Sequence, residues 1–411
     1  MKVNGIIAEY NPFHNGHKYQ LEESRRQLGA DYTVIAMSGN FMQRGIPALL
    51  DKYRRAEMAL KNGADLVVEI PACYSASSAE YFATGAVCLL DKLGVVDHLC
   101  FGSECGDIGI LKRIADILLK EPDEYVRCLK RNLRQGLSYP NARTNALLQY
   151  DPSLSSQKDV LSSPNNILGI EYLKALSRRH SAIVPFTTLR AGSDYHDRRL
   201  GENQSSALAI RQAVFSRQDF DFLESQMPES AYLIIKEYLL TAKPVHINDF
   251  SFALHYKLLS ERENGYDRFL DVSSDLSDRI RKNLFRFDSF RGFCDLLKSK
   301  ELTYSRISRC LLHILLDMDT DTLERYQAMD YIPYARVLGF RRDAAPLLSA
   351  IKEKASIPLV TKLADADKLL GTEAYEMLKK ETNINNIYQS TLALKSKRSM
   401  ENEYSTPIVI L

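Results

Sequence analysis

Residues 3–17 read VNGIIAEYNPFHNGH, and this stretch decides the fold class. The residues from Val3 to Ile7 are apolar or small, which is typical of a buried strand, and a helical pattern begins near Gly16. The same alternation then predicts strands at 32–37, 66–70 and 98–101 and helices at 49–61 and 78–93. Apolar strands separated by helices predict an α/β fold with a parallel sheet that is covered on both faces.

A change of pattern near residue 216 divides the chain into two predicted domains. A strand at 182–186, a polar loop and a helix at 205–215 close the first domain, residues 1–216. Beyond it the hydrophobic pattern is helical, without convincing strand alternation. Helices are predicted at 232–240, 250–259, 275–284, 290–297, 303–317, 344–353 and 359–367. We therefore expect a mainly α-helical second domain, residues 217–411.

Two histidines lie where the first strand meets the first helix, in the sequence HNGH at residues 14–17. Free backbone N–H groups and the helix dipole at a helix N-terminus attract phosphate, and Gly16 lets the backbone come close to it. Imidazole N–H groups there can stabilise charge that develops on an α-phosphate and on departing pyrophosphate. The alternative is a capping turn with incidental surface histidines, although ligands of open α/β sheets bind at this end of a strand. The arrangement is similar to the HxGH motif of the nucleotidyltransferase superfamily, and it predicts a Rossmann-like nucleotidyltransferase domain with His14 and His17 as catalytic residues.

A second candidate motif is SSALAIR at residues 205–211. Hydroxyl groups at a helix N-terminus and one arginine would complement the β- and γ-phosphates from the side opposite the histidines. Ser206 and Arg211 are therefore candidate catalytic residues. A serine cap before an amphipathic helix explains the motif equally well.

Two further loops are candidates for the substrate pocket. The loop SGNFMQRG at 38–45 joins the second strand to the next helix and, with Lys52 and Arg55 that follow it, could line the pocket. Its Gln43 and Arg44 could hold a small carboxylate or phosphate. A solvated polar loop is the alternative. In FGSE at 101–104, Gly102 would let adenine or ribose pack on bare backbone, and a plain turn is the competing explanation.

The composition excludes several classes of protein. With 54 basic and 52 acidic residues the net charge is +2, so any nucleic-acid surface must be a local patch. The seven cysteines are odd in number and form no CxxC pair, which predicts a reducing compartment, buried structural thiols and no metal site. The N-terminus is too short and too polar for a signal peptide, and no apolar run is long enough for a membrane span. We therefore expect a cytoplasmic protein without a membrane partner.

Five co-linear motifs together resemble the bacterial tRNA(Met) cytidine acetate ligases. They are EYNPFHNGH, MSGNFMQRG, FGSE, SPNNILGIEYLKAL at 163–176 and LRAGSDYHD, and the resemblance continues through YSRISRCLLHILL at 304–316 and ARVLGFRRD at 335–343. It implies an enzyme that uses ATP and acetate to form acetyl-adenylate and acetylates N4 of the wobble cytidine of elongator tRNA(Met). Mg²⁺ is expected with a triphosphate substrate.

The resemblance also implies a set of ATP-binding residues. Most of them belong to the opening strand, loop and helix. Three further contacts lie along the chain, at Gly102, Asn165 and Arg190, and Asn166 and Ala191 are their neighbours. The implied ATP site comprises Ile7, Ala8, Glu9, Tyr10, Asn11, Pro12, Phe13, His14, Asn15, Gly16, His17, Lys18, Tyr19, Gln20, Gly102, Asn165, Arg190 and Ala191.

Arginines of the second domain are candidates for RNA contact, because phosphate contacts and base stacking need cations and aromatic rings. A solvated helix face above a phenylalanine core is the alternative. The candidates are Arg279, Arg281, Lys282, Arg286 and Arg291 with Phe285, Phe287 and Phe290, followed by Arg306, Arg309, Arg336, Arg341 and Arg342. A small-molecule adenylyltransferase, such as a pantetheine-phosphate or nicotinamide-mononucleotide type, and a non-enzymatic RNA-binding protein remain as alternative functions.

Overall fold

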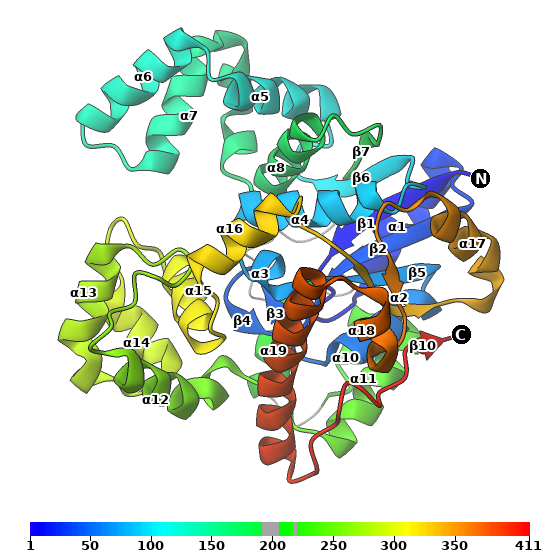
Figure 1. Cartoon of the computed structure of the whole chain (residues 1–411). Helices are drawn as coiled ribbons and strands as arrows, with labels where there is room; N and C mark the ends of the chain where they lie inside the picture. The colour runs from blue at the N-terminus through cyan, green and yellow to red at the C-terminus, as the bar shows by residue number, and fades with distance from the viewer. Residues whose placement is uncertain (191–204, 217–219) are drawn as a thin grey trace.

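The computed structural model describes residues 1–190, 205–216 and 220–411, apart from the side chains of residues 156–159. Its central sheet has the strand order β10-β8-β5-β2-β1-β6-β7, with β9 paired to β8 (Figure 1). The strands are β1 (Val3–Ala8), β2 (Tyr32–Ser38), β5 (Leu66–Ile70), β6 (His98–Ser103), β7 (Val184–Leu189), β8 (Ala335–Phe340), β9 (Leu359–Val360) and β10 (Val409–Ile410). Neighbouring strands are parallel except for β5 and β8. The predicted α/β class is therefore confirmed.

Both faces of the sheet are covered by helices. Ile6 packs in one core with α1 (Asn15–Leu28) and α2 (Lys52–Lys61), whereas its neighbour Ile7 packs in another with α4 (Ala79–Lys92) and α8 (Pro164–Arg178). Successive side chains of a strand point to opposite faces, so a strand between two cores is apolar at nearly every position. This is the reason that β1 and β2 could be recognised as continuous apolar runs.

The chain beyond residue 216 is rich in helices. They include α11 (Glu229–Thr241), α12 (Ser251–Glu261), α13 (Ser274–Asn283), α14 (Phe290–Leu297), α15 (Tyr304–Leu315), α16 (Thr320–Ala328), α17 (Ala345–Lys354), α18 (Ala366–Leu369) and α19 (Thr372–Ser396). We call α12–α15 the lobe. It lies against the hairpin of β3 (Phe41–Met42) and β4 (Ile46–Pro47), where Ser308 Oγ donates to the Gly45 carbonyl at 2.7 Å. A Cβ on Gly45 would lie 2.5 Å from the Arg309 amide nitrogen, so only glycine allows this approach.

Two expectations for the second half were wrong. Strands do occur there, since β8 joins the sheet beside β5, and residues 359–367 are not one helix but contain β9 and the start of α18. A six-residue apolar segment buried on both faces, such as β8, shows no alternation and cannot be told from a buried helix by periodicity. The division after residue 216 stays a prediction, and the sheet takes strands from both sides of it.

A helical arm that the sequence pattern did not predict is inserted between β6 and α8. It follows α5 (Ile108–Lys120) and consists of α6 (Asp123–Arg134) and α7 (Tyr139–Tyr150). Figure 1 shows the arm above and the lobe below, both on the side of the sheet that faces away from the two termini. The carboxyl end of β1 points to this side, so the arm and the lobe flank the end of the sheet where the HNGH turn lies.

Candidate active site

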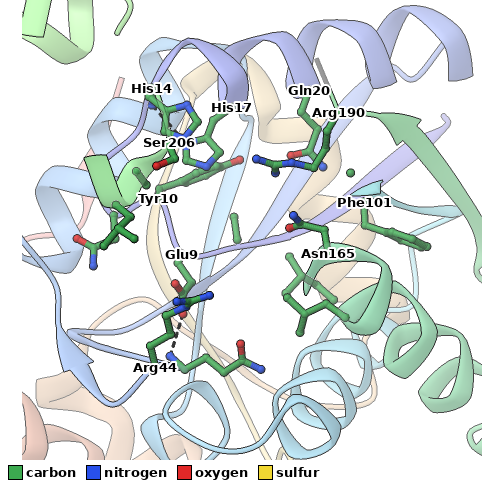
Figure 2. A pocket seen from close by; sticks show the side chains of 18 of the residues that line it. Glu9, Tyr10, His14, His17, Gln20, Arg44, Phe101, Asn165, Arg190 and Ser206 are labelled. Atoms are coloured by element: carbon green, nitrogen blue, oxygen red, sulfur yellow. Dashed lines mark hydrogen bonds between the residues drawn. The ribbon is translucent and has the colours of Figure 1, made fainter. Parts of the chain in front are cut away.

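The two imidazoles lie at the N-terminus of α1, directly after β1 (Figure 2). His14 is the N-cap residue, and its Nδ1 accepts a hydrogen bond from the Gly16 N–H at 3.1 Å. His17 Nδ1 accepts one from the His14 N–H at 3.3 Å. Because each Nδ1 is an acceptor, each neutral ring carries its proton on Nε2. The rings stack with centroids 3.7 Å apart, so α1 presents a pair of imidazole N–H donors at its positively polarised end.

Two buried aromatic rings hold this pair in place. Tyr10 packs edge-on against His17 and against Phe13, with ring centroids 4.9 Å apart in both cases. The backbone of Tyr10 is left-handed, with φ of 47°, a conformation that costs a non-glycine residue about 1–3 kcal/mol and is concentrated at functional sites. The Tyr10 hydroxyl is buried without a hydrogen-bond partner among the described residues, and burial raises its pKa. Tyr10 therefore acts here as a packing ring.

Two arginines set the electrostatics of the histidines. Arg211 of α9 (Ala207–Ser216) donates to the Asn11 carbonyl, and Arg190 follows β7. Burial lowers the pKa of His14 to about 3, and Arg190 and Arg211 act in the same direction. Burial, then His14, then Arg190 hold the pKa of His17 well below its usual value. Both rings are thus neutral at pH 7, in a positive potential that suits a polyanion such as a triphosphate.

Ser206 both caps a helix and lines the pocket. Its Oγ accepts a hydrogen bond from the Ala209 N–H at 3.1 Å, which is the interaction of a helix cap. It also lines the pocket, beside His14 and Tyr10 in Figure 2. A capping hydroxyl can still contact a ligand with its remaining hydrogen-bonding capacity.

The end of β6 and the start of α8 form another wall of the pocket. The Glu104 carboxylate accepts from the Asn166 N–H at 2.8 Å and from the Asn165 side chain at 2.7 Å, and Asn166 Oδ1 accepts from the Glu104 N–H at 2.9 Å. These bonds place Asn165 on the pocket and bury Asn166 behind it. A Cβ on Gly102 would lie 3.1 Å from Cγ of Arg190, so the bare backbone lets that side chain cross β6.

The third wall comes from β1 and the loop after β2. Glu9 Oε1 accepts from the Gln43 N–H at 2.8 Å, and Glu9, Gln43 and Arg44 all line the pocket (Figure 2). The expectation that Lys52 and Arg55 also face it was wrong. Arg55 is fully buried and donates to the carbonyls of residues 9, 38, 39 and 50, so it holds the ends of β1 and β2 together. Lys52 is buried in an ion cluster with Glu69 and Glu403.

The structure brings most of the predicted site residues to one pocket. It is lined by Ile7, Ala8, Glu9, Tyr10, Asn11, His14, His17, Gln20, Gly102, Asn165, Arg190, Ser206 and Arg211. Others of the opening segment point elsewhere: Lys18 pairs with Glu22, Tyr19 is 41% exposed, and Asn15 donates to the Ser225 carbonyl. Pro12 and Phe13 are buried, and Gly16 has its N–H bonded to His14. Ala191 lies outside the described residues.

Sequence reasoning missed an apolar wall of the same pocket. Leu168 and Tyr172 of α8, Phe82 of α4 and Phe101 of β6 line it, and the Phe101 and Tyr172 rings are 5.6 Å apart. Positions 165, 168 and 172 have the spacing i, i+3, i+7, which places them on one face of a helix. That spacing could have identified Leu168 and Tyr172 once Asn165 was a candidate. An apolar wall with a few polar groups is typical of a site for a small ligand with a flat ring.

The chain matches known proteins over its whole length. A family model described as HIGH Nucleotidyl Transferase matches residues 1–403. The chain is 40% identical over 415 residues to the tRNA(Met) cytidine acetate ligase of Acetivibrio thermocellus and 41% identical over 412 residues to that of Caldanaerobacter subterraneus subsp. tengcongensis. Each alignment covers 100% of both chains. The chain belongs to the tRNA(Met) cytidine acetate ligase family. The resemblance stated from the motifs is thereby confirmed.

Solved structures agree with this membership of the acetate ligase family. Thermotoga maritima TmcAL in its apo form I has a TM-score of 0.94, and the same protein bound with alpha-thio ATP has a TM-score of 0.91. Both are 33% identical to this chain and cover 100% of it. A neighbour of the same fold therefore binds an ATP analogue.

Other features of this family member bear on its chemistry. Burial raises the pKa of Cys88 to about 11 and that of Cys100 to about 12, so these thiols stay protonated at neutral pH. In the part of the chain that the structure describes, no group of three or more His, Cys, Asp and Glu side chains could hold a metal ion. Within the same residues, no helix has the length and apolarity of a membrane span.

Proposed function

We propose that this protein activates acetate with ATP as acetyl-adenylate and transfers the acetyl group to N4 of the wobble cytidine of elongator tRNA(Met), forming N4-acetylcytidine. The observation that carries this proposal is the pair of Nε2-protonated imidazoles at the N-terminus of α1, inside a pocket with Arg190 and Arg211. Full-length relatives named for this reaction support it.

In the first half-reaction, an acetate oxygen attacks the α-phosphorus, and the bond from that phosphorus to the pyrophosphate oxygen breaks. Negative charge accumulates on the departing pyrophosphate. His14 and His17 donate to this charge from one side, and Ser206 and Arg211 complete the phosphate site from the other. Removing one donor of this kind typically costs about a hundredfold in rate.

The nucleoside and the acetyl group occupy the other two walls. The apolar wall with Gly102, Asn165 and Tyr172 receives the adenosine, and the wall of Glu9, Gln43 and Arg44 receives acetate and then cytosine. In the second half-reaction, cytosine N4 attacks the acetyl carbonyl carbon, AMP leaves and N4 loses a proton. Rate depends mainly on holding N4 within reach of the carbonyl, so no acyl-enzyme is needed.

Mg²⁺ accompanies the triphosphate in this proposal. Magnesium in nucleotide enzymes is held largely by substrate phosphates and water rather than by an all-protein cage. A tRNA-modifying reaction would place the protein in the cytoplasm.

The lobe supplies part of the RNA-binding surface. Arg281, Lys282, Arg286 and Arg291 are exposed, and Phe285 is 76% exposed with the Arg262 guanidinium 5.2 Å from its ring centroid. Exposed cations beside a free aromatic ring suit phosphate contacts and base stacking.

Several residues predicted for RNA contact are placed elsewhere. Phe290 is fully buried, and Phe287 stacks on His255 with centroids 4.5 Å apart. Arg336 is buried in the core. Arg341 pairs with Asp343, and its N–H donates to the Asp65 carbonyl just before β5, at the amino ends of the parallel strands, whereas the pocket lies at their carboxyl ends. The N–H of Arg342 donates to the Leu411 carbonyl in the same region.

Purified protein provides the test. Acetate-dependent exchange of labelled pyrophosphate into ATP reports the first half-reaction, and mass analysis of nucleosides from incubated tRNA(Met) reports N4-acetylcytidine. We expect both with ATP, acetate and Mg²⁺. Exchange that required pantetheine phosphate or nicotinamide mononucleotide instead of acetate would identify a small-molecule adenylyltransferase and overturn the proposal.

A further inference from the structure

The arm carries a dense stripe of positive charge. From residue 125 to residue 150 the chain has five cationic side chains and no acidic one, although the whole chain has a net charge of only +2. Four of the cations, at positions 127, 130, 131 and 134, follow the spacing i, i+3, i+4, i+7 and therefore share one face of α6. All four are exposed.

The opposite face of α6 is fixed against α7. Tyr125, Cys128 and Asn132 are buried, and Asn132 Nδ2 donates to the Ala142 carbonyl at 3.2 Å. The cationic face is thus turned to solvent by the packing of the arm. Since most of the apolar face is already covered and Leu133 is the one large apolar side chain of α6 that is exposed, α6 presents little hydrophobic surface with which to enter a lipid surface.

Little in the protein neutralises the stripe. Arg131 donates to Gln149 at 2.9 Å, and Arg127, Lys130 and Arg134 form no ion pair with any residue that the structure describes. Like charges at these spacings destabilise a helix by about 0.2–0.5 kcal/mol per pair. A polyanion bound along the face would remove this cost and release its own counterions.

The position of the arm relates the stripe to the pocket. The arm is inserted between Gly102 and Asn165, which both line the pocket, and Glu104 fastens the two segments together. The arm and the lobe lie on the same side of the sheet in Figure 1. A long ligand that enters the pocket at one point therefore has a cationic surface on either side of it.

We propose that the cationic face of α6 binds backbone phosphates of the tRNA while the target cytidine occupies the pocket. This inference rests on the proposed function, since it takes the RNA substrate from it. The contacts are to phosphate rather than to bases, so they position the tRNA without reading its sequence.

The test compares two triple charge reversals with equal changes in net charge. The arm variant is R127E/K130E/R134E. The control is R342E/K352E/K354E, whose positions are exposed in or just before α17, on the side of the sheet away from the arm in Figure 1. We expect both to keep acetate-dependent pyrophosphate exchange within about twofold, which shows that they fold and activate acetate. At about 0.15 M salt the arm variant should raise the KM for tRNA by roughly tenfold to a hundredfold, with less than threefold for the control.

Salt dependence sharpens the test. The slope of log Kd for tRNA against log salt should become shallower by about one for each phosphate contact removed. An unchanged KM for tRNA and an unchanged salt slope in the arm variant would overturn the proposal, as would equal losses of tRNA affinity in both variants. The proposal would also be overturned if the wild type bound vesicles with 30% phosphatidylserine while the arm variant bound tRNA as the wild type does. A gel-shift assay of tRNA(Met) binding tests the arm independently of acetylation. Failure of the wild type to form acetylcytidine would count against the proposed function, not against the role of the arm.

Discussion

The histidine pair and the buried cluster around Lys52 lie at the ends of neighbouring strands but treat charge in opposite ways. At the histidines, burial and the two arginines all lower the pKa of His14, so the site accumulates positive potential and keeps its imidazoles neutral. Burial would also lower the pKa of Lys52, but Glu403 and Glu69 outweigh it and the pKa is raised. The cations beside His14 lower its pKa, whereas the carboxylates beside Lys52 raise the pKa of that ammonium.

This difference separates a binding site from a structural contact. The Lys52 ammonium lies 2.8 Å from Glu69 and bonds to Glu403, which joins α2 and β5 to the segment after α19. Lys52 therefore has its counter-ions within the chain. The positive potential beside His14 suits a phosphate, and the following predictions test that distinction in order of decreasing effect.

The largest effect is expected for H14A/H17A. Removing both donors to the departing pyrophosphate should lower acetate-dependent exchange by at least about a thousandfold. Loss of the helix cap should also lower the free energy of unfolding by about 1–2 kcal/mol. The matched control is His246→Ala, because His246 is also an N-cap residue whose Nδ1 accepts a backbone N–H, from Asn248 at 3.2 Å, but it lies outside the pocket. Equal losses of exchange activity in the two variants would mean that His14 and His17 serve to cap the helix rather than to catalyse the reaction.

Lys52→Met should affect stability instead. It leaves Glu69 and Glu403 buried without their cation, which costs about 3–5 kcal/mol and should lower Tm by about 3–6 °C. Exchange activity measured well below the new Tm should stay within about threefold. Lys362→Ala, which removes an exposed pair with Asp365, is the control and should change stability by less than about 0.5 kcal/mol. A large loss of activity at unchanged Tm would place Lys52 in the active site after all.

The pH dependence of stability should reveal the neutral histidines. The pKa of His14 is about 3 in the folded protein and about 6.5 when unfolded, so the unfolded state takes up more protons below pH 6.5. The contribution of neutral His14 to the free energy of unfolding is therefore fully present above about pH 6.5. It is lost as pH falls toward 3, at about 1.4 kcal/mol per pH unit. ATP phosphates favour the imidazolium, so the rise in Tm on adding ATP should be larger at pH 5.5 than at pH 7.5. H14Q/H17Q should lose this dependence, and an identical ATP effect at both pH values in the wild type would contradict the assignment.

The smallest effect is expected for Tyr10→Phe. The buried hydroxyl has no hydrogen-bond partner among the described residues, so its removal should leave stability unchanged or raise it by about 1 kcal/mol. Thermal unfolding of the protein without ATP measures this. A marked rise in the KM for ATP would show that the hydroxyl contacts the nucleotide, in addition to the ring packing on His17.

Much of the fold and site was predictable because it is encoded locally. The strand and helix around HNGH follow from apolar periodicity over about fifteen residues, and the role of His14 and His17 follows from their place at a helix N-terminus. The exposed face of α6 also has a local pattern, although the arm itself was not predicted. Lys52 and Arg55 were placed wrongly because a sequence does not say which face of α2 meets the core.

The sequence by itself determined the α/β class, the histidine pair and the resemblance to the acetate ligase family, since each depends on residues close together in the chain. Only the tertiary structure decided that Gly102, Asn165, Arg190 and Arg211 meet those histidines in one pocket, and that β8 pairs with β5. The physical reason is the separation along the chain over which each kind of interaction acts. Helix capping and hydrophobic periodicity act between near neighbours. Contacts between residues far apart in the chain, such as Arg211 with Asn11, depend on how all the elements pack together.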